Sequence, residues 1–133
     1  MSLVNLNSII KIINTIDDSL NPYDLDTDTI TSIGSFVVPS NSVVLVNGIV
    51  SFNGVGSDNT SYQYSISDTD DTLGTQNIFL LTTIPDTVPN YQNPLSSIIE
   101  NKTNNPITYY ITVETTFTTG TVSCYAYINI LTI

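Results

Sequence analysis

The feature that most constrains this chain is an alternation of apolar and polar residues that continues from about Ile30 to the C-terminus. Successive side chains of a β-strand point to opposite faces, so a period of two gives each strand one apolar face. Runs rich in Val, Ile, Thr, Tyr and Phe are separated by clusters of Gly, Pro, Asn and Asp, which end strands. This pattern predicts an all-β antiparallel sandwich. We expect strands at about 30–38, 42–53, 60–67, 76–83, 107–117 and 121–132.

The last two of these strands are predicted to form a hairpin whose loop lies at Thr119-Gly120. Each strand has one apolar face, and a slip by one residue would place apolar side chains opposite polar ones. Cys124 points inward in this arrangement, and we expect a buried thiol rather than a reactive one. The predicted register pairs Phe117 with Val122, Val113 with Ala126, and Ile111 with Ile128.

Two other segments have less certain boundaries. Asn47-Gly48 lies between apolar runs, which indicates either a hairpin turn or one long strand with the glycine at a close approach. We favour the single strand, and its continuous apolar run predicts a central position with burial on both faces. Segment 84–106 contains four prolines and is predicted to be a long connection with one short strand near Leu95–Ile99.

The N-terminal residues 1–21 are predicted to form a segment separate from the sandwich, which we place at residues 22–133 with an acidic linker at 22–32. Two interpretations are open: an oligomerising coiled-coil stalk, or a short helix or strand packed on the body. The second is favoured, because the repeat is short and Asp17 interrupts it. The residues at coiled-coil spacing are Leu3, Leu6, Ile10, Ile13, Asp17 and Leu20.

The charge balance excludes several classes of function. The chain has a net charge of −10 with only two lysines and no arginine, so we expect no nucleic-acid partner and no anionic membrane surface. It has no histidine and a single cysteine, which removes His-based catalysis, thiolate zinc sites and intrachain disulfides. No stretch has the pattern of a membrane span or a signal peptide. We expect that the protein is not an enzyme.

Two stretches together carry a family resemblance. Residues 36–52, FVVPSNSVVLVNGIVSF, resemble the opening of C1q/TNF-like jelly-roll domains, and residues 120–133, GTVSCYAYINILTI, are similar to their last strand. Such domains are heads of virus and phage fibres or lie on spore surfaces. The resemblance covers residues 30–133 and implies a trimer of jelly-roll sandwiches, on a particle surface and outward-facing. Its implied function is assembly and recognition through outer loops.

The candidate interface combines this implication with the pattern of tyrosines. Tyr125 and Tyr127 share the outward face of the last strand, and tyrosine supplies rigid amphipathic contact area. Their two interpretations are a subunit interface and a second packed face within the chain. The residues predicted to meet a neighbouring chain are Leu3, Leu6, Ile10 and Ile13 in the N-terminal segment, and Tyr110, Tyr125, Tyr127 and Leu131 in the sandwich.

The acidic loop residues allow one candidate metal site. Asp58, Asp68, Asp70 and Asp71 could supply the oxygen ligands that Ca²⁺ prefers, although a solvated acidic turn is the favoured interpretation. We therefore expect no required cofactor. The first functional hypothesis is a trimeric particle-surface head used in assembly or attachment, which meets other particle proteins or a cell-surface glycan or protein. The alternative is a monomeric carbohydrate-binding module with bound calcium.

Overall fold

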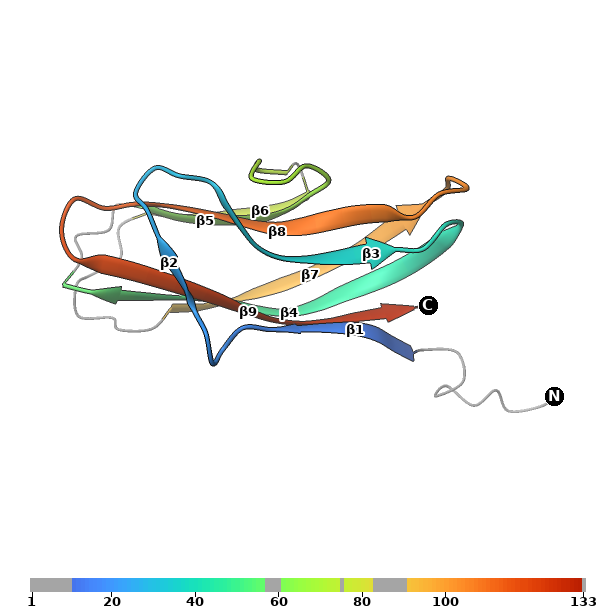
Figure 1. Ribbon diagram of the computed structural model, residues 1–133, viewed down its shortest axis with the longest axis horizontal. Coiled ribbons are helices and arrows are strands. Elements are labelled where there is room, and N and C mark those ends of the chain that lie inside the picture. Colours follow the sequence, from blue (N-terminus) through green and yellow to red (C-terminus); the bar gives the residue numbers. More distant parts are fainter. Residues whose placement is uncertain (1–10, 57–60, 75, 83–90, 133) are drawn as a thin grey trace.

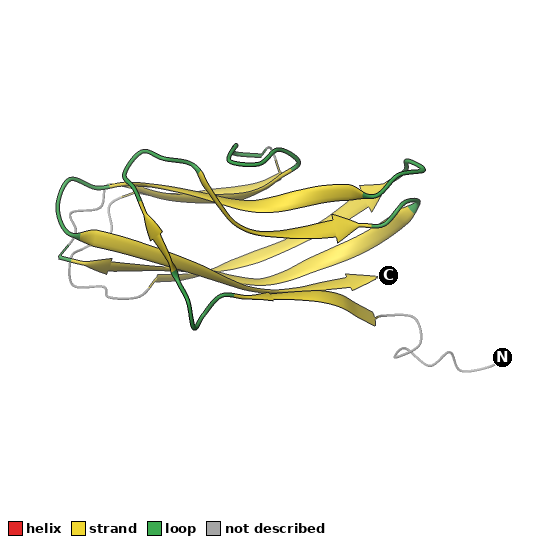
Figure 2. Cartoon of the chain, in the orientation of Figure 1, coloured by secondary structure: helices red, strands yellow, loops and turns green. Residues whose placement is uncertain are grey.

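The computed structural model describes residues 11–56, 61–74, 76–82 and 91–132, and this part of the chain contains only strands and loops (Figure 2). Two antiparallel sheets pack face to face as a sandwich (Figure 1). One sheet has the order β1-β9-β4-β7, with β2 also paired to β9, and the other has the order β3-β8-β5-β6. The strands are β1 Lys11–Asp17, β2 Tyr23–Leu25, β3 Thr31–Val38, β4 Ser42–Val55, β5 Ser61–Ser67, β6 Gln76–Thr82, β7 Tyr91–Asn101, β8 Ile107–Thr116 and β9 Thr121–Thr132.

The connections between strands follow a jelly-roll path. With β2 set aside, the chain changes sheets after every described strand except β5, which pairs with β6 in the same sheet. β1 and β2 run one after the other along the same edge of β9. Eight strands in two sheets with such crossing connections are the jelly-roll arrangement. The predicted all-β sandwich of jelly-roll type is therefore confirmed.

The predicted hairpin of the last two strands is wrong. β8 lies between β3 and β5 in the four-stranded sheet, whereas β9 lies between β1 and β4 in the five-stranded sheet. The connection after Thr116 crosses from one sheet to the other, so the apolar faces of β8 and β9 look at each other across the core. An alternating pattern fits side-by-side pairing and face-to-face packing equally well, which is why it could not decide between them.

The single long strand predicted around Asn47-Gly48 is confirmed. β4 pairs with β7 on one side and β9 on the other, so its predicted central position is also correct. A Cβ atom on Gly48 would lie 2.0 Å from the backbone oxygen of Tyr127, so only glycine fits there. Burial on both faces is wrong: Val44 and Val46 are fully buried, whereas Leu45 on the opposite face is partly exposed.

The segment predicted as a proline-rich connection contains a longer strand than expected. β7 pairs with β4 along its whole length, from Phe52↔Tyr91 to Ser42↔Asn101. Pro94 lies in the middle of β7, which is the edge strand of its sheet, and an edge strand tolerates the missing N–H group. The acidic stretch 22–32, predicted as a linker, includes the short strand β2.

The coiled-coil interpretation does not hold for residues 11–17, which form the edge strand β1. Its backbone groups pair antiparallel with β9, and Ile16 points inward and is buried. The edge of β9 offers unpaired backbone N–H and C=O groups. Residues 11–17 can therefore pair within the same chain and need no coiled-coil partner from a second chain. Ile13 lies at an irregularity of the register between Ile12 and Asn14, and Leu3, Leu6 and Ile10 fall outside the described residues.

The core between the sheets contains a stacked aromatic pair toward each end, Phe36 with Tyr109 and Phe52 with Tyr62. Phe52 of β4 stacks on Tyr62 of β5 with ring centroids 4.4 Å apart. The buried Tyr64 hydroxyl crosses the core and donates a 2.8 Å hydrogen bond to the Pro94 carbonyl, and burial raises the pKa of Tyr64 to about 12. Cys124 is buried as predicted, and burial raises the pKa of its thiol. The two sheets thus hold each other through side chains that reach across the sandwich.

Candidate interaction surfaces

The outer face of the five-stranded sheet carries a row of four aliphatic side chains that crosses all its long strands. Backbone pairing places Leu45 of β4 opposite both Ile98 of β7 and Leu131 of β9, and Leu131 opposite Ile12 of β1. Ile98 is 67 % exposed and Ile12 is 54 % exposed, and Leu45 and Leu131 between them are partly buried. Folding of the chain does not require large aliphatic side chains to be exposed side by side on an outward face, so this row indicates a contact surface.

A second apolar row lies four residues further along the same strands, beyond a polar one. Ile49 of β4 is opposite Pro94 of β7 and Tyr127 of β9, and Tyr127 is 44 % exposed. In the polar row between them, the Thr15 hydroxyl donates a 2.9 Å hydrogen bond to the Asn129 side chain. The face therefore alternates apolar, polar and apolar rows.

The predicted interface tyrosines divide between the two sheets. Tyr125, Tyr127 and Leu131 all point outward from β9 and share the face just described. Tyr110 belongs to β8 and pairs with Ser35 and Ser67, so it lies on the outer side of the opposite sheet. Because Tyr127 is exposed, the alternative of a second packed face within the chain does not hold for it. A single flat interface cannot include all three tyrosines.

The outer face of the four-stranded sheet is covered by the chain itself in its central part, around the outward residues Ser65, Ser67 and Thr112. Ser65 and Thr112 point outward, yet both are fully buried, and their hydroxyl oxygens lie 2.6 Å apart. The loop 68–74 after β5 lies over this face (Figure 1), and the Gly74 N–H donates to the Ser65 hydroxyl at 2.9 Å. The loop also reaches β3, because the Ser32 N–H donates to the Asp71 carboxylate and the Asp71 N–H donates to the Ser32 hydroxyl.

The acidic loop residues are not gathered into a metal centre in the part of the chain that the structure describes. Asp71 accepts its hydrogen bond from Ser32, whereas Asp68 accepts one from the Thr69 hydroxyl. Within the described ranges, no three Asp, Glu, His or Cys side chains are close enough to share a metal ion. Asp58 of the predicted calcium site lies outside the described residues, so the full predicted set is not tested.

Sequence reasoning missed one unusual carboxylate, Asp18, in the turn between β1 and β2. One of its oxygens is buried and has no hydrogen-bond partner, and burial together with the Asp17 charge raises its pKa. Burial and the negative charge of Asp18 together raise the pKa values of Tyr23 and Cys124, so both of these side chains lie near Asp18. These three residues come together because β1 and β2 both pair with β9, and no spacing in the sequence indicates this pairing.

A hollow of about 380 Å³ lies at the end of the sandwich where β2 meets the crossing between β8 and β9. It combines two carboxylates with the ring of a partly buried aromatic residue. Aromatic and carboxylate groups are chemically suited to a sugar ring, whose apolar face stacks and whose hydroxyls donate hydrogen bonds. The lining residues are Asp24, Leu25, Asp26, Phe117, Gly120, Thr121 and Val122.

Comparison with known proteins adds a similarity of fold to solved structures. No protein-family model matches the chain, and no curated protein matches it. Among solved structures, it is similar to a chain of the T13 IBDV viral particle, with 13 % sequence identity and a TM-score of 0.54. The alignment covers 100 % of this chain and 35 % of that chain, so the present sequence spans about a third of that protein. The described residues contain no helix that is long and apolar enough to cross a membrane.

Proposed function

We propose that this chain is a structural domain of a virus or similar protein particle, where it associates with other particle proteins. The observation that carries the proposal is the outer face of the five-stranded sheet, which has two exposed apolar rows in register. Exposed apolar side chains that line up in rows are typical of a contact surface, which a building block of a particle needs. The similarity of fold to a chain of a viral particle supports the same role.

The finer form of this proposal is a trimeric, outward-facing head used in assembly or attachment, as the resemblance to C1q/TNF-like domains implies. In this form, polar loops such as 68–74 and 102–106 would meet a partner on a cell surface. Catalysis is not part of the proposal. The chain lacks histidine, and its buried Cys124 has a raised thiol pKa, which makes it a poor nucleophile.

A monomeric carbohydrate-binding module is the second candidate function. The hollow that combines Phe117 with Asp24 and Asp26 favours it, because this pairing of groups suits a sugar. Calcium binding by the loop that holds Asp68, Asp70 and Asp71 would belong to this alternative.

The two functions are separated by measuring the solution mass and the glycan binding of the same preparation. For a structural building block, we expect an assembly well above the 14.5 kDa of one chain, with trimers near three times that mass. A monomer that binds glycans on an array, and loses this binding in the Phe117→Ala variant, would overturn the structural proposal. Melting curves with and without a chelator test the calcium component, which requires a lower melting temperature when Ca²⁺ is removed.

A further inference from the structure

We infer that the outer face of the five-stranded sheet binds the same face of a second copy of this chain. This inference rests on the proposed structural role and names the partner that the role requires. Two copies would bring this face together around a two-fold axis, and each would bury the apolar rows of the other. The argument has three parts: the register of the rows, the distribution of charge, and the size of the face.

The register produces a surface that can match a copy of itself. One apolar row is centred on Leu45 and Leu131, the other on Ile49 and Tyr127, and a polar row separates them. When two such faces meet, apolar rows can lie against apolar rows while Asn47, in the polar row, keeps hydrogen-bonding groups at the contact. A one-row displacement would place aliphatic side chains on amides, so the alternation also fixes the alignment of the copies.

The charge distribution favours this face for a contact between copies of the chain. A protein with a net charge of −10 repels its own copies, so a contact between copies is least unfavourable on the surface that has the fewest acidic groups. The two apolar rows and the polar row contain no carboxylate except Asp17, at the edge beside Tyr127. Glu100 and Asp24 lie at other margins of the face, opposite Val43 and Ser123.

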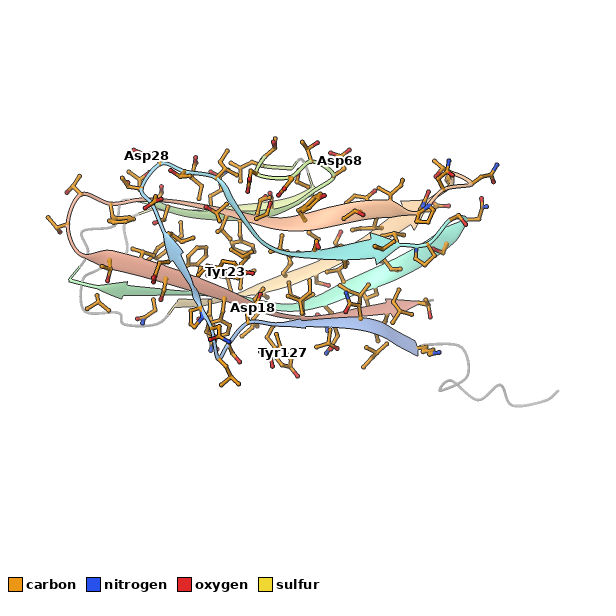
Figure 3. The ribbon with its side chains drawn as sticks, in the orientation of Figure 1. Asp18, Tyr23, Asp28, Asp68 and Tyr127 are labelled. Atoms are coloured by element: carbon orange, nitrogen blue, oxygen red, sulfur yellow. The ribbon has the colours of Figure 1, made fainter. Side chains whose placement is uncertain are left out.

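Acidic groups gather on the opposite side of the molecule. Figure 3 shows Asp28 and Asp68 on the side of the four-stranded sheet, and Tyr127 on the far side of the sandwich. The middle strand of that sheet also carries Glu114 on its outer face, opposite Gln63. Copies that met through the four-stranded sheet would therefore bring carboxylates together, whereas copies that meet through the five-stranded sheet keep them apart.

The face is large enough for a stable contact. The strands of this sheet contain 7, 3, 14, 11 and 12 residues, each residue advances about 3.3 Å along its strand, and neighbouring strands lie about 4.8 Å apart. The flat footprint is then roughly 740 Å², close to the about 800 Å² that a standard protein interface buries on each partner. A sheet-on-sheet contact over this area also reproduces the packing that already holds the sandwich together.

The test compares matched lysine substitutions on the two sheets of the full chain. Leu45→Lys places a charge at the centre of the apolar row, and Val37→Lys is its control on the outward side of β3, where Val37 is 48 % exposed. Molar mass is measured by sedimentation equilibrium over a range of concentrations. We expect the wild type and Val37→Lys to form the same assembly, and Leu45→Lys to dissociate with a Kd raised at least about tenfold.

A milder pair of substitutions keeps the test valid if Leu45→Lys does not fold, as judged by circular dichroism. Ile98→Ser and Tyr127→Ser remove exposed apolar groups without adding charge, and together they should also shift the assembly to 14.5 kDa monomers. An assembly whose mass these variants leave unchanged overturns the inference and leaves the structural role standing. A monomeric wild type also overturns it, whether residues 1–10 or a different protein covers the face. A monomer that binds glycans overturns both.

Discussion

The two sheets of this sandwich have the same strand periodicity but opposite outer surfaces. On the four-stranded sheet, outward hydroxyls such as Ser65 and Thr112 are buried beneath the chain's own loop and bonded to each other. On the five-stranded sheet, outward side chains such as Ile98 and Tyr127 remain exposed, and nothing in the described residues covers them. Part of one face is covered within the chain, whereas the apolar rows of the other face remain open to a partner. The chemistry of the outward residues, rather than their spacing, distinguishes these two cases.

The largest loss of stability is expected at Gly48, where the backbones of β4 and β9 approach closely. Gly48→Ala would place a methyl group 2.0 Å from the Tyr127 carbonyl oxygen and 2.6 Å from the Ile128 Cα, both of which are backbone atoms. The central pairing of β4 with β9 would have to open, so we expect a loss of about 3 kcal/mol or more in unfolding free energy. Urea denaturation measures it. Gly56→Ala is the control, with no atom near its added methyl group but a positive φ of 61°; equal losses in both variants would contradict the steric explanation.

A smaller loss is expected where a single side chain joins the two sheets. The buried Asn101 amide at the end of β7 donates to the Val38 carbonyl on β3 and to the Pro39 and Asn105 carbonyls, and its oxygen accepts from Thr103. Asn101→Ala removes these hydrogen bonds from a buried position, and although the Pro39 and Asn105 carbonyls still accept from the Ser42 and Thr103 hydroxyls, the bonds to the Val38 carbonyl and from the Thr103 N–H are lost. We therefore expect about 2 kcal/mol of destabilisation in urea. The neighbouring Lys102→Ala is a control, because its exposed side chain makes a 3.9 Å ion pair of little value. Comparable stability of the two variants would contradict the bridging role.

Removing one hydroxyl tests whether the four-stranded sheet is completed internally. Ser65→Ala takes away the partner of the Thr112 hydroxyl and the Gly74 N–H, so we expect about 1–2 kcal/mol of destabilisation. Asn47→Ala changes an exposed outward residue of the five-stranded sheet and should alter monomer stability by less than about 0.5 kcal/mol. Both are measured in urea under conditions where the chain is monomeric. If Asn47→Ala costs as much as Ser65→Ala, the contrast between the faces is wrong.

The smallest change in stability is expected from Asp17 and Asp18, the two adjacent carboxylates at the β1–β2 turn. Hydrogen bonds from the Ser19 hydroxyl and N–H lower the pKa of Asp17, whereas burial and the Asp17 charge raise the pKa of Asp18. A raised carboxyl pKa means that the folded chain binds the proton more tightly, so stability falls as pH rises from about 4 through the folded pKa. Asp18→Asn should therefore raise the melting temperature by a few degrees at pH 7 and leave it unchanged near pH 3.

The neighbouring residue, Asp17, is expected to change stability with pH in the opposite direction to Asp18. Asp17 contributes stability above its ordinary pKa of 3.8 and loses it as pH falls through the lowered folded pKa. Asp17→Asn should slightly lower the melting temperature at pH 7, and this difference should disappear in strong acid. Melting curves recorded by circular dichroism from about pH 1.5 to pH 8 distinguish the two, because this range extends below the lowered pKa of Asp17. A parallel response of both variants would mean that the buried oxygen of Asp18 is not the cause.

Much of the fold could be predicted from residue patterns because those patterns are local. Alternation placed the strands from Thr31 to Thr132 within one or two residues, except β7, whose length was underestimated because Pro94 is compatible with an edge strand. The candidate interface was only partly predictable. Outward orientation of Tyr125 and Tyr127 follows from the period of two, but the position of Tyr110 on the other sheet depends on strand order.

The sequence by itself determined that this chain forms strands, which side chains point inward, and that it carries no histidine and only two basic residues. These properties depend on residue type and on a two-residue period, both of which are read along the chain. The tertiary structure alone decided which strands are neighbours: that β8 and β9 part into different sheets, that β1 takes the open edge of β9, and that four aliphatic residues from four strands align in one row. Strand pairing is a choice among partners with similar apolar faces, and only the packing of the whole chain makes that choice.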